Sequence, residues 1–265
     1  MQHYHTEQHG VKPNAMDFTL PSDGDKAVLM VHGVTASPYP LRDFAHFLNA
    51  HRMHVRVPRL PGHGTHEEDL ERTSFSDMAE AVRQELHALR KIKPKVYVLG
   101  YSFGANLVLD VARDDSDKID GMVLMSPAIR IRKEWLLRFL TRFYDRFTPV
   151  RFRPFPGLRK KSKEHLEERI ARGYYNYIPV RSTAGLFQYI DTHTKQQLEA
   201  VTAPCLIMHP KNDPLTLPYS SQYIHDRIGS ADKQLLIVDS HDHVLVSRKD
   251  LEVAYACVAD FLKNH

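Results

Sequence analysis

The sequence predicts a doubly wound, mostly parallel α/β sheet with an inserted helical cap, and three observations lead to this prediction. Short runs rich in Val, Ile and Leu are apolar almost throughout, as in strands covered on both faces. Longer amphipathic segments lie between these runs, so strand and helix alternate along the chain. The alternation is interrupted once, over residues 130–203, where helical patterning continues without a convincing strand.

The individual elements follow from these patterns. The apolar runs predict strands at residues 27–33, 54–58, 96–100, 121–126, 205–209 and 234–238. The amphipathic segments predict helices at residues 42–51, 74–91, 103–113, 217–228 and 249–263. Thr73 or Ser76 is the expected N-terminal cap of the second helix. Because crossovers between parallel strands are right-handed, this order places helices on both faces of one sheet.

The length of 265 residues fits one domain with a modest insertion. We expect a core formed by residues 1–129 and 204–265, and a helical cap formed by residues 130–203. A block of that length is too long for a bare loop in a compact domain. It is therefore expected to lie over the carboxyl ends of the strands, where open α/β sheets bind their ligands.

Composition excludes several classes of protein. A hydrophobic content of 42% is too high for a disordered chain. The apolar runs fall far short of the roughly 20 residues of a membrane helix, and residues 1–10 lack the pattern of a secretory signal, so we expect a cytoplasmic protein. A net charge of +4 gives little reason to expect nucleic-acid binding. Cys205 and Cys257 are expected to be reduced thiols.

The most informative motif is Gly100-Tyr101-Ser102-Phe103-Gly104, which matches G-x-S-x-G between a predicted strand and a predicted helix. The turn strains the serine backbone, and glycine two residues before and after the serine relieves the crowding. The serine hydroxyl then projects above the sheet at a helix N-terminus, which favours a developing negative charge. The motif alone is weak evidence, but in this setting it predicts Ser102 as a nucleophile.

A serine hydroxyl needs a base to take its proton as it attacks. We expect His243 to be that base, because it follows the predicted strand 234–238. His241 remains an alternative, since a loop at a strand end could turn either ring inward.

The base in turn needs a carboxylate that orients it. Asp213 follows the predicted strand 205–209, at the same edge of the sheet as Ser102 and His243. Asp239 and Asp242 compete for this role, but their closeness to the histidine in sequence favours turn positions.

The developing oxyanion needs hydrogen-bond donors. Gly33 would let the backbone approach the bound carbonyl, and we assign the oxyanion hole to the backbone N–H groups of Val34 and Phe103. His32 is expected to hold the loop rather than react.

Together these segments resemble the carboxylesterase and monoacylglycerol-lipase branch of the α/β hydrolases. The resemblance rests on His32-Gly33-Val34-Thr35, Leu60-Pro61-Gly62-His63-Gly64, Gly100 to Gly104, Asn212-Asp213-Pro214 and His243-Val244-Leu245. It implies the α/β-hydrolase fold and hydrolysis of acyl esters through an acyl-enzyme, without a metal or an organic cofactor. It also implies that His63 belongs to a structural loop. The extra histidine, His241, departs from the family pattern, and the cap resembles family caps only in size and place.

The cap should shape the substrate pocket. Residues 130–147 interleave arginines with aromatic and leucine side chains at helical spacing. The apolar face would line an acyl pocket or pack on the core, although docking on an anionic membrane surface is an alternative. We expect an ester of a short to medium acyl chain, or a monoacylglycerol, as substrate. The expected pocket residues are Trp135, Phe139, Phe143, Phe187 and Tyr189.

Other functions remain open from the sequence. The same machinery could cleave a thioester or a peptide with a free amino end, and a peptidase would need an acidic cap residue such as Glu134, Glu164, Glu167 or Glu168. A non-catalytic binding protein could keep the fold. The histidines near the start, His3, His5 and His9, lack a supporting carboxylate or cysteine constellation, so we expect a flexible terminus rather than a metal site.

Overall fold

The structure is a computed structural model that describes residues 4, 6–144, 151–152, 162–241, 243 and 251–265. Its centre is a seven-stranded sheet in the order β1-β3-β2-β4-β5-β8-β9. Only β1 runs antiparallel, against β3, and the other neighbours pair in parallel. The strands are β1 (Phe18–Leu20), β2 (Lys26–Val31), β3 (His54–Val57), β4 (Lys95–Tyr101), β5 (Gly121–Met125), β8 (Cys205–Pro210) and β9 (Lys233–Val238).

All six strands expected from apolar runs are present, so the predicted doubly wound sheet is confirmed. The edge strand β1 was not predicted. It has only three residues, none of them buried, and such a short segment carries no clear periodic pattern.

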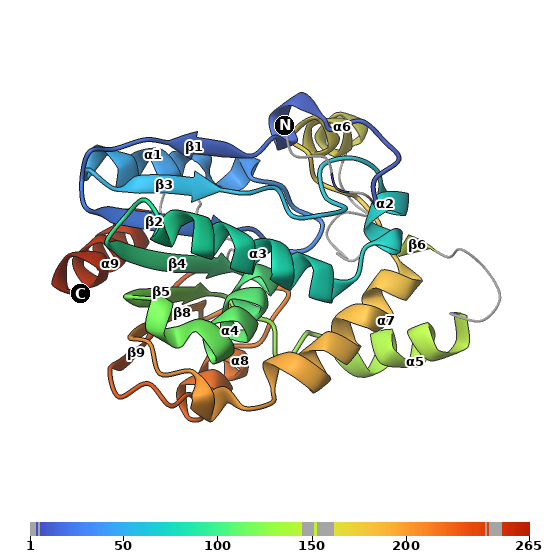
Figure 1. Ribbon diagram of the computed structural model, residues 1–265. Helices are drawn as coiled ribbons and strands as arrows, with labels where there is room; N and C mark the ends of the chain where they lie inside the picture. Colours follow the sequence, from blue (N-terminus) through green and yellow to red (C-terminus); the bar gives the residue numbers. More distant parts are fainter. Residues whose placement is uncertain (1–3, 5, 145–150, 153–161, 242, 244–250) are drawn as a thin grey trace.

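Helices cover both faces of this sheet (Figure 1). In β2, Val28 and Met30 pack with α1 and α9, whereas Leu29 and Val31 pack with α3 and α4. Because alternate residues of a strand point to opposite faces, both sets are buried and the strand reads as apolar throughout. Full burial of one such side chain contributes about 1.5–3 kcal/mol. The helices are α1 (Arg42–Ala50), α3 (Phe75–Arg90), α4 (Phe103–Asp115), α8 (Tyr219–His225) and α9 (Leu251–Asn264).

The helix α3 begins at Phe75, and its N-terminal cap is neither of the two expected residues. Ser74 is the cap, and its hydroxyl accepts a hydrogen bond from the Asp77 N–H while the Asp77 carboxylate accepts one from the Ser74 N–H. This reciprocal pair satisfies two N–H groups that the helix leaves without partners. The prediction of Thr73 or Ser76 as the cap was wrong because it overlooked the S-x-x-D spacing.

The segment between β5 and β8 contains the helices α5 (Glu134–Tyr144), α6 (Lys163–Ala171) and α7 (Val180–Tyr189). These helices lie beyond the ends to which β3 and β4 point (Figure 1). The segment also contains a two-stranded antiparallel ribbon of β6 (Arg151–Phe152) and β7 (Ile178–Pro179), so the expectation of no strand here was wrong. Each strand has two residues, too few to show a period of two. The division into a core and a cap of residues 130–203 stays a prediction.

The helices α5 and α7 are joined through one arginine. The Arg138 guanidinium donates to the carboxylates of Glu134 and Asp191 and lies 4.5 Å from the centre of the Phe187 ring. Within the part of the chain that the structure describes, no helix combines the length and the apolar character needed to cross a membrane.

Candidate active site

Ser102 lies at the sharp turn between β4 and α4. Its φ of 53° and ψ of −123° form a strained backbone conformation for a residue with a side chain. A Cβ added at Gly100 would lie 2.5 Å from the Ala105 Cα, and one at Gly104 would lie 2.3 Å from the Val31 carbonyl oxygen. No side chain fits at these distances, so both glycines of the motif are required by close backbone approach.

The structure brings the three predicted catalytic side chains together. The His243 Nε2 lies 2.9 Å from the Ser102 Oγ, and the His243 Nδ1 lies 2.6 Å from the Asp213 Oδ2. Asp213 is fully buried and His243 is 7% exposed. These distances allow a proton to pass from the serine hydroxyl to the imidazole while the carboxylate holds the other ring nitrogen.

The competing residues lie elsewhere. His241 is exposed, and its Nε2 is 3.4 Å from the Asn212 side-chain nitrogen. Asp239 is exposed, and Asp242 lies outside the described residues. Of the two histidines that the sequence left open, the structure therefore places only His243 against Ser102.

The Asp213 carboxylate is held by several donors. Its Oδ1 accepts hydrogen bonds from the N–H groups of Leu215 (2.7 Å) and Thr216 (3.0 Å), and its Oδ2 accepts one from the Thr216 hydroxyl (2.8 Å). Burial alone would raise the pKa of Asp213, but hydrogen bonds from His209, His243 and the Leu215 N–H outweigh it and hold that pKa well below its ordinary value. The carboxylate is therefore ionised at neutral pH, as the orienting role requires.

Two supporting residues were missed by the sequence reasoning. His209, near the end of β8, is fully buried, with its Nδ1 2.8 Å from the Ser221 hydroxyl and its Nε2 3.4 Å from the Asp213 Oδ2. Ser126, directly after β5, donates its hydroxyl to the His243 carbonyl oxygen at 2.9 Å. Polar residues at the carboxyl ends of buried parallel strands were the available signal, because those ends converge on the site.

The loop after β2 lies directly against the serine. A Cβ added at Gly33 would lie 3.0 Å from the Ser102 Cβ, so a side chain at position 33 would crowd the serine. Phe103 is the first residue of α4, and the first N–H groups of a helix have no partner within the helix. Val34, next to Gly33, is half-buried. The assignment of the oxyanion hole to the N–H groups of Val34 and Phe103 stays a prediction.

His32 fixes the shape of this loop. Its Nε2 accepts the Leu60 N–H at 3.1 Å, so the proton must be on Nδ1, which donates to the Gly33 carbonyl oxygen at 2.9 Å. Burial lowers the pKa of His32 well below its ordinary value, and nearby His63 adds to this effect. A neutral imidazole in this tautomer links the loop after β2 to the loop after β3.

His63 is equally buried and neutral. Its Nδ1 is 3.0 Å from the Pro61 carbonyl oxygen, and burial lowers the pKa of His63 to about 4. The structure therefore places both histidines in the framework around the site.

The predicted pocket residues whose side chains the structure describes lie in different surroundings. Trp135 and Phe139 are 74% and 55% exposed. Phe187 is buried beneath the Arg138 guanidinium, between α5 and α7. The Phe143 side chain lies outside the described residues. The helical period identified a helix correctly, but Trp135 and Phe139, its described aromatic side chains, are mostly exposed.

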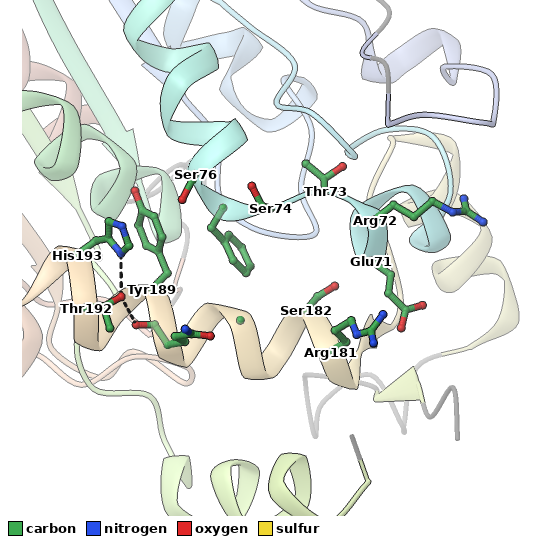
Figure 2. Close-up of a pocket in the computed structure, with 13 residues that line it drawn as sticks. Glu71, Arg72, Thr73, Ser74, Ser76, Arg181, Ser182, Tyr189, Thr192 and His193 are labelled. Carbon is green, nitrogen blue, oxygen red and sulfur yellow. Dashed lines mark hydrogen bonds between the residues drawn. The ribbon is translucent and has the colours of Figure 1, made fainter. Parts of the chain in front are cut away.

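Tyr189, the fifth of these residues, lines a cavity of about 350 Å³ (Figure 2). The cavity lies between α7 and the segment where α2 (Glu67–Arg72) ends and α3 begins. The Tyr189 ring is 5.5 Å from the Phe103 ring, but Ser102 is not among the residues that line the cavity. The lining residues are Glu71 to Ser76, Arg181, Ser182, Gly185, Gln188, Tyr189, Thr192 and His193.

The sheet, the strained serine turn and the chain order of the three side chains define an α/β hydrolase, as the sequence predicted. The sequence profile of the family described as serine aminopeptidase, S33 (Hydrolase_4), matches residues 22–250, and this chain belongs to that family.

Proteins of known activity resemble the chain over nearly its whole length. A thermostable monoacylglycerol lipase of Bacillus sp. (strain H-257) is 28% identical, with 98% of this chain and 99% of the lipase aligned. A carboxylesterase of Bacillus subtilis (strain 168) is 24% identical, with 91% and 94% aligned.

Solved structures share the fold. A structure from a study of LipS and LipT, two metagenome-derived lipolytic enzymes, has a TM-score of 0.82 at 24% identity and covers 97% of this chain and 100% of its own. The monoacylglycerol lipase of Paleococcus ferrophilus has a TM-score of 0.73 at 19% identity, with 93% and 98% covered.

Proposed function

We propose that this chain is a serine carboxylic-ester hydrolase that acts through an acyl-enzyme on Ser102. One observation carries the proposal: the side chains of Ser102, His243 and Asp213 form a continuous line of proton-transfer contacts of 2.9 and 2.6 Å. The relatives named as ester hydrolases support the same reaction class.

In the first half of the reaction, the His243 Nε2 takes the proton of the Ser102 hydroxyl as Oγ attacks the ester carbonyl carbon. The carbonyl oxygen becomes an oxyanion, which accepts hydrogen bonds from the N–H groups of Val34 and Phe103. The carbon–oxygen bond to the alcohol then breaks, and the protonated His243 gives its proton to the leaving alkoxide. Asp213 stays ionised throughout and stabilises the imidazolium.

In the second half, water replaces the alcohol. His243 takes a proton from the water, whose oxygen attacks the acyl carbon, and the same oxyanion hole holds the second tetrahedral intermediate. Cleavage of the bond to Ser102 releases the carboxylic acid, and His243 returns the proton to the serine oxygen.

The ester is favoured over the peptide by the surroundings of the cap carboxylates. A peptidase that recognises a free amino end needs an acidic group for the amine. Glu134 is bound to Arg138, Glu167 lies 3.7 Å from Lys163, and Glu168 pairs with Arg172. Glu164 is hydrogen-bonded to the Ser162 side chain at the start of α6. The pairing of these carboxylates disfavours a peptidase. The named relatives favour an ester of a short to medium acyl chain or a monoacylglycerol as substrate.

A fluorophosphonate probe tests the nucleophile. We expect the wild-type chain to be labelled stoichiometrically and the Ser102→Ala variant to remain unlabelled, because the probe reacts only with an activated serine. The two proteins should have the same circular dichroism spectrum and unfolding midpoint. Equal labelling of both proteins would refute the assignment of Ser102. Labelling without turnover of nitrophenyl esters, monoacylglycerol or acyl thioesters would instead refute the substrate class.

A further inference from the structure

Three side chains with metal-binding atoms meet on the side of the core that carries α2, and the proposed hydrolysis uses none of them. His9 comes from the N-terminal segment, and His66 and Glu68 come from the start of α2. Their ligand atoms all lie within 4.8 Å of one another. The side chains are 38%, 37% and 40% exposed, so a cation could reach the cluster without unfolding the chain. His9 was not expected to bind a metal because no carboxylate or cysteine constellation supports it in the sequence, whereas the fold brings Glu68 close to it.

The spacing of the cluster is close to that of a coordination shell. The Glu68 Oε2 lies 3.8 Å from the His9 Nε2 and 4.0 Å from the His66 Nδ1. Ligand atoms around a tetrahedral Zn²⁺ are about 3.4 Å apart, given bonds of about 2.1 Å. The His9 and His66 rings are stacked, with centroids 4.4 Å apart and planes at 28°. Binding a cation therefore requires the three partly exposed side chains to rotate until their ligand atoms converge. The His66 Nδ1 would then exchange a long 3.3 Å hydrogen bond from the Glu68 N–H for a metal bond.

His9 is already oriented for this role by a neighbouring carboxylate. The fully buried Asp69 accepts the N–H groups of Gln8 (2.9 Å) and His9 (3.2 Å), and its Oδ1 lies 3.1 Å from the His9 Nδ1. A hydrogen bond from Nδ1 to the carboxylate leaves the lone pair on Nε2, which faces Glu68. Metal-binding histidines characteristically donate their other ring nitrogen to a carboxylate in this way, which fixes the tautomer and the ring orientation.

The segment that carries His9 is held on the core, so the expectation of a flexible terminus was wrong for its described residues. The Tyr4 hydroxyl donates to the Arg59 carbonyl oxygen at 2.8 Å. The Glu7 carboxylate binds the buried Arg59 guanidinium and accepts the Gly62 N–H. These contacts cover the loop that follows β3. A cation shared by His9 and α2 would add a further link between this segment and the core.

We propose that His9, His66 and Glu68 bind one divalent cation of the zinc type, with water completing the shell and Asp69 orienting His9. Two imidazoles and one carboxylate select borderline metals such as Zn²⁺, Co²⁺ and Ni²⁺ over Mg²⁺ and Ca²⁺, which prefer oxygen ligands alone. The site is structural: it shares no residue with the Ser102 site, and the cation stabilises the folded chain by binding it in preference to the unfolded chain. The proposal does not depend on the hydrolase assignment.

The test uses the full chain without an affinity tag, stripped of metal by a chelator and titrated with Zn²⁺ by calorimetry. We expect one equivalent to bind and the unfolding midpoint to rise by several degrees in excess Zn²⁺, while Mg²⁺ has no effect. Glu68→Gln keeps the shape of the side chain but removes its charge, and His66→Ala removes one ligand. Each should weaken binding by about tenfold or more.

Two controls separate this site from other histidines. His225→Ala removes a partly exposed histidine elsewhere on the surface, and a combined His3→Ala and His5→Ala variant removes the neighbouring histidines that lie outside the described residues. Both should bind Zn²⁺ as the wild type does. Co²⁺ should give a visible absorption band that Glu68→Gln and His66→Ala lose. The proposal is overturned if Zn²⁺ does not bind stoichiometrically, or if these two variants bind it with unchanged affinity.

Discussion

Two regions of the molecule differ in how their side chains are surrounded. One is the edge of the sheet at which Ser102 lies, and the other is α5, the first helix of the predicted cap. At this edge, Asp213 is fully buried and His243 is 7% exposed. The two side chains are hydrogen-bonded to each other, the Leu215 N–H donates to Asp213, and Ser126, directly after β5, donates to the His243 carbonyl oxygen. On α5, Trp135 is 74% exposed and Phe139 is 55% exposed. The geometry of the reacting groups therefore depends on residues that follow the strands, whereas Trp135 and Phe139 of α5 are mostly exposed. Substitutions in the two regions should have effects of very different size.

The largest effect is expected for His243. Replacing it with alanine removes the base, and kcat should fall roughly 10⁴-fold, as for other members of such triads. His241→Ala removes an exposed ring whose Nε2 lies 3.4 Å from the Asn212 side-chain nitrogen, so kcat should change far less. Steady-state hydrolysis of a nitrophenyl ester measures both. If His241→Ala is the more damaging change in two equally stable proteins, the base has been assigned to the wrong histidine.

A smaller effect is expected for His209, whose Nε2 lies 3.4 Å from the Asp213 Oδ2. His209→Leu leaves the buried Asp213 carboxylate with one donor fewer, at a cost of about 1–3 kcal/mol in the free energy of unfolding. His209→Gln places an amide nitrogen near the position of Nε2 and should recover part of the loss. Urea unfolding measures both variants. Equal stability of His209→Leu and the wild type at pH 7 would contradict the role of His209.

The difference in the free energy of unfolding between the wild type and His209→Leu should depend on pH, and its direction follows from the pKa of Asp213. The pKa of Asp213 is lower in the folded chain than its ordinary value of 3.8, so its ionised form stabilises the fold above that pH. This contribution is lost as the pH falls below 3.8 toward the lower folded-state pKa. The part of the difference between the wild type and His209→Leu that comes from Asp213 should therefore be fully present above about pH 5 and narrow in more acidic solution.

The sequence predicted those features of the molecule that a single strand pattern or a single motif specifies. Ser102, Asp213 and His243 each follow an apolar run, and the carboxyl ends of parallel strands converge, so the order of strands alone predicts that these three residues approach one another. His209 and Ser126 belong to no motif, and their roles depend on side-chain directions that only the folded chain defines. The cluster of His9, His66 and Glu68 was missed for a related reason, because it joins segments that are distant in sequence.

The aromatic residues of α5 show where periodicity stops being informative. A period of 3.6 identifies an apolar face, but it does not say whether that face meets a core, a ligand or solvent. Trp135 and Phe139 were expected to line a pocket and are mostly exposed, whereas Phe187, expected to line the same pocket, is buried. All three are aromatic residues of the predicted cap, and the packing of α5 on α7 decided the outcome.

The smallest effect is therefore expected on α5. Trp135→Ser removes a side chain that is 74% exposed, and the free energy of unfolding should change by no more than about 0.5 kcal/mol. Phe187→Ala is the matched change on α7, and because Phe187 is 3% exposed it should cost about 3–5 kcal/mol. Urea unfolding compares the two. A large loss in Trp135→Ser would mean that this side chain is covered in solution, by another part of the chain or by a second copy. In that case α5 would be as constrained as the sheet edge, and the contrast between the two regions would not hold.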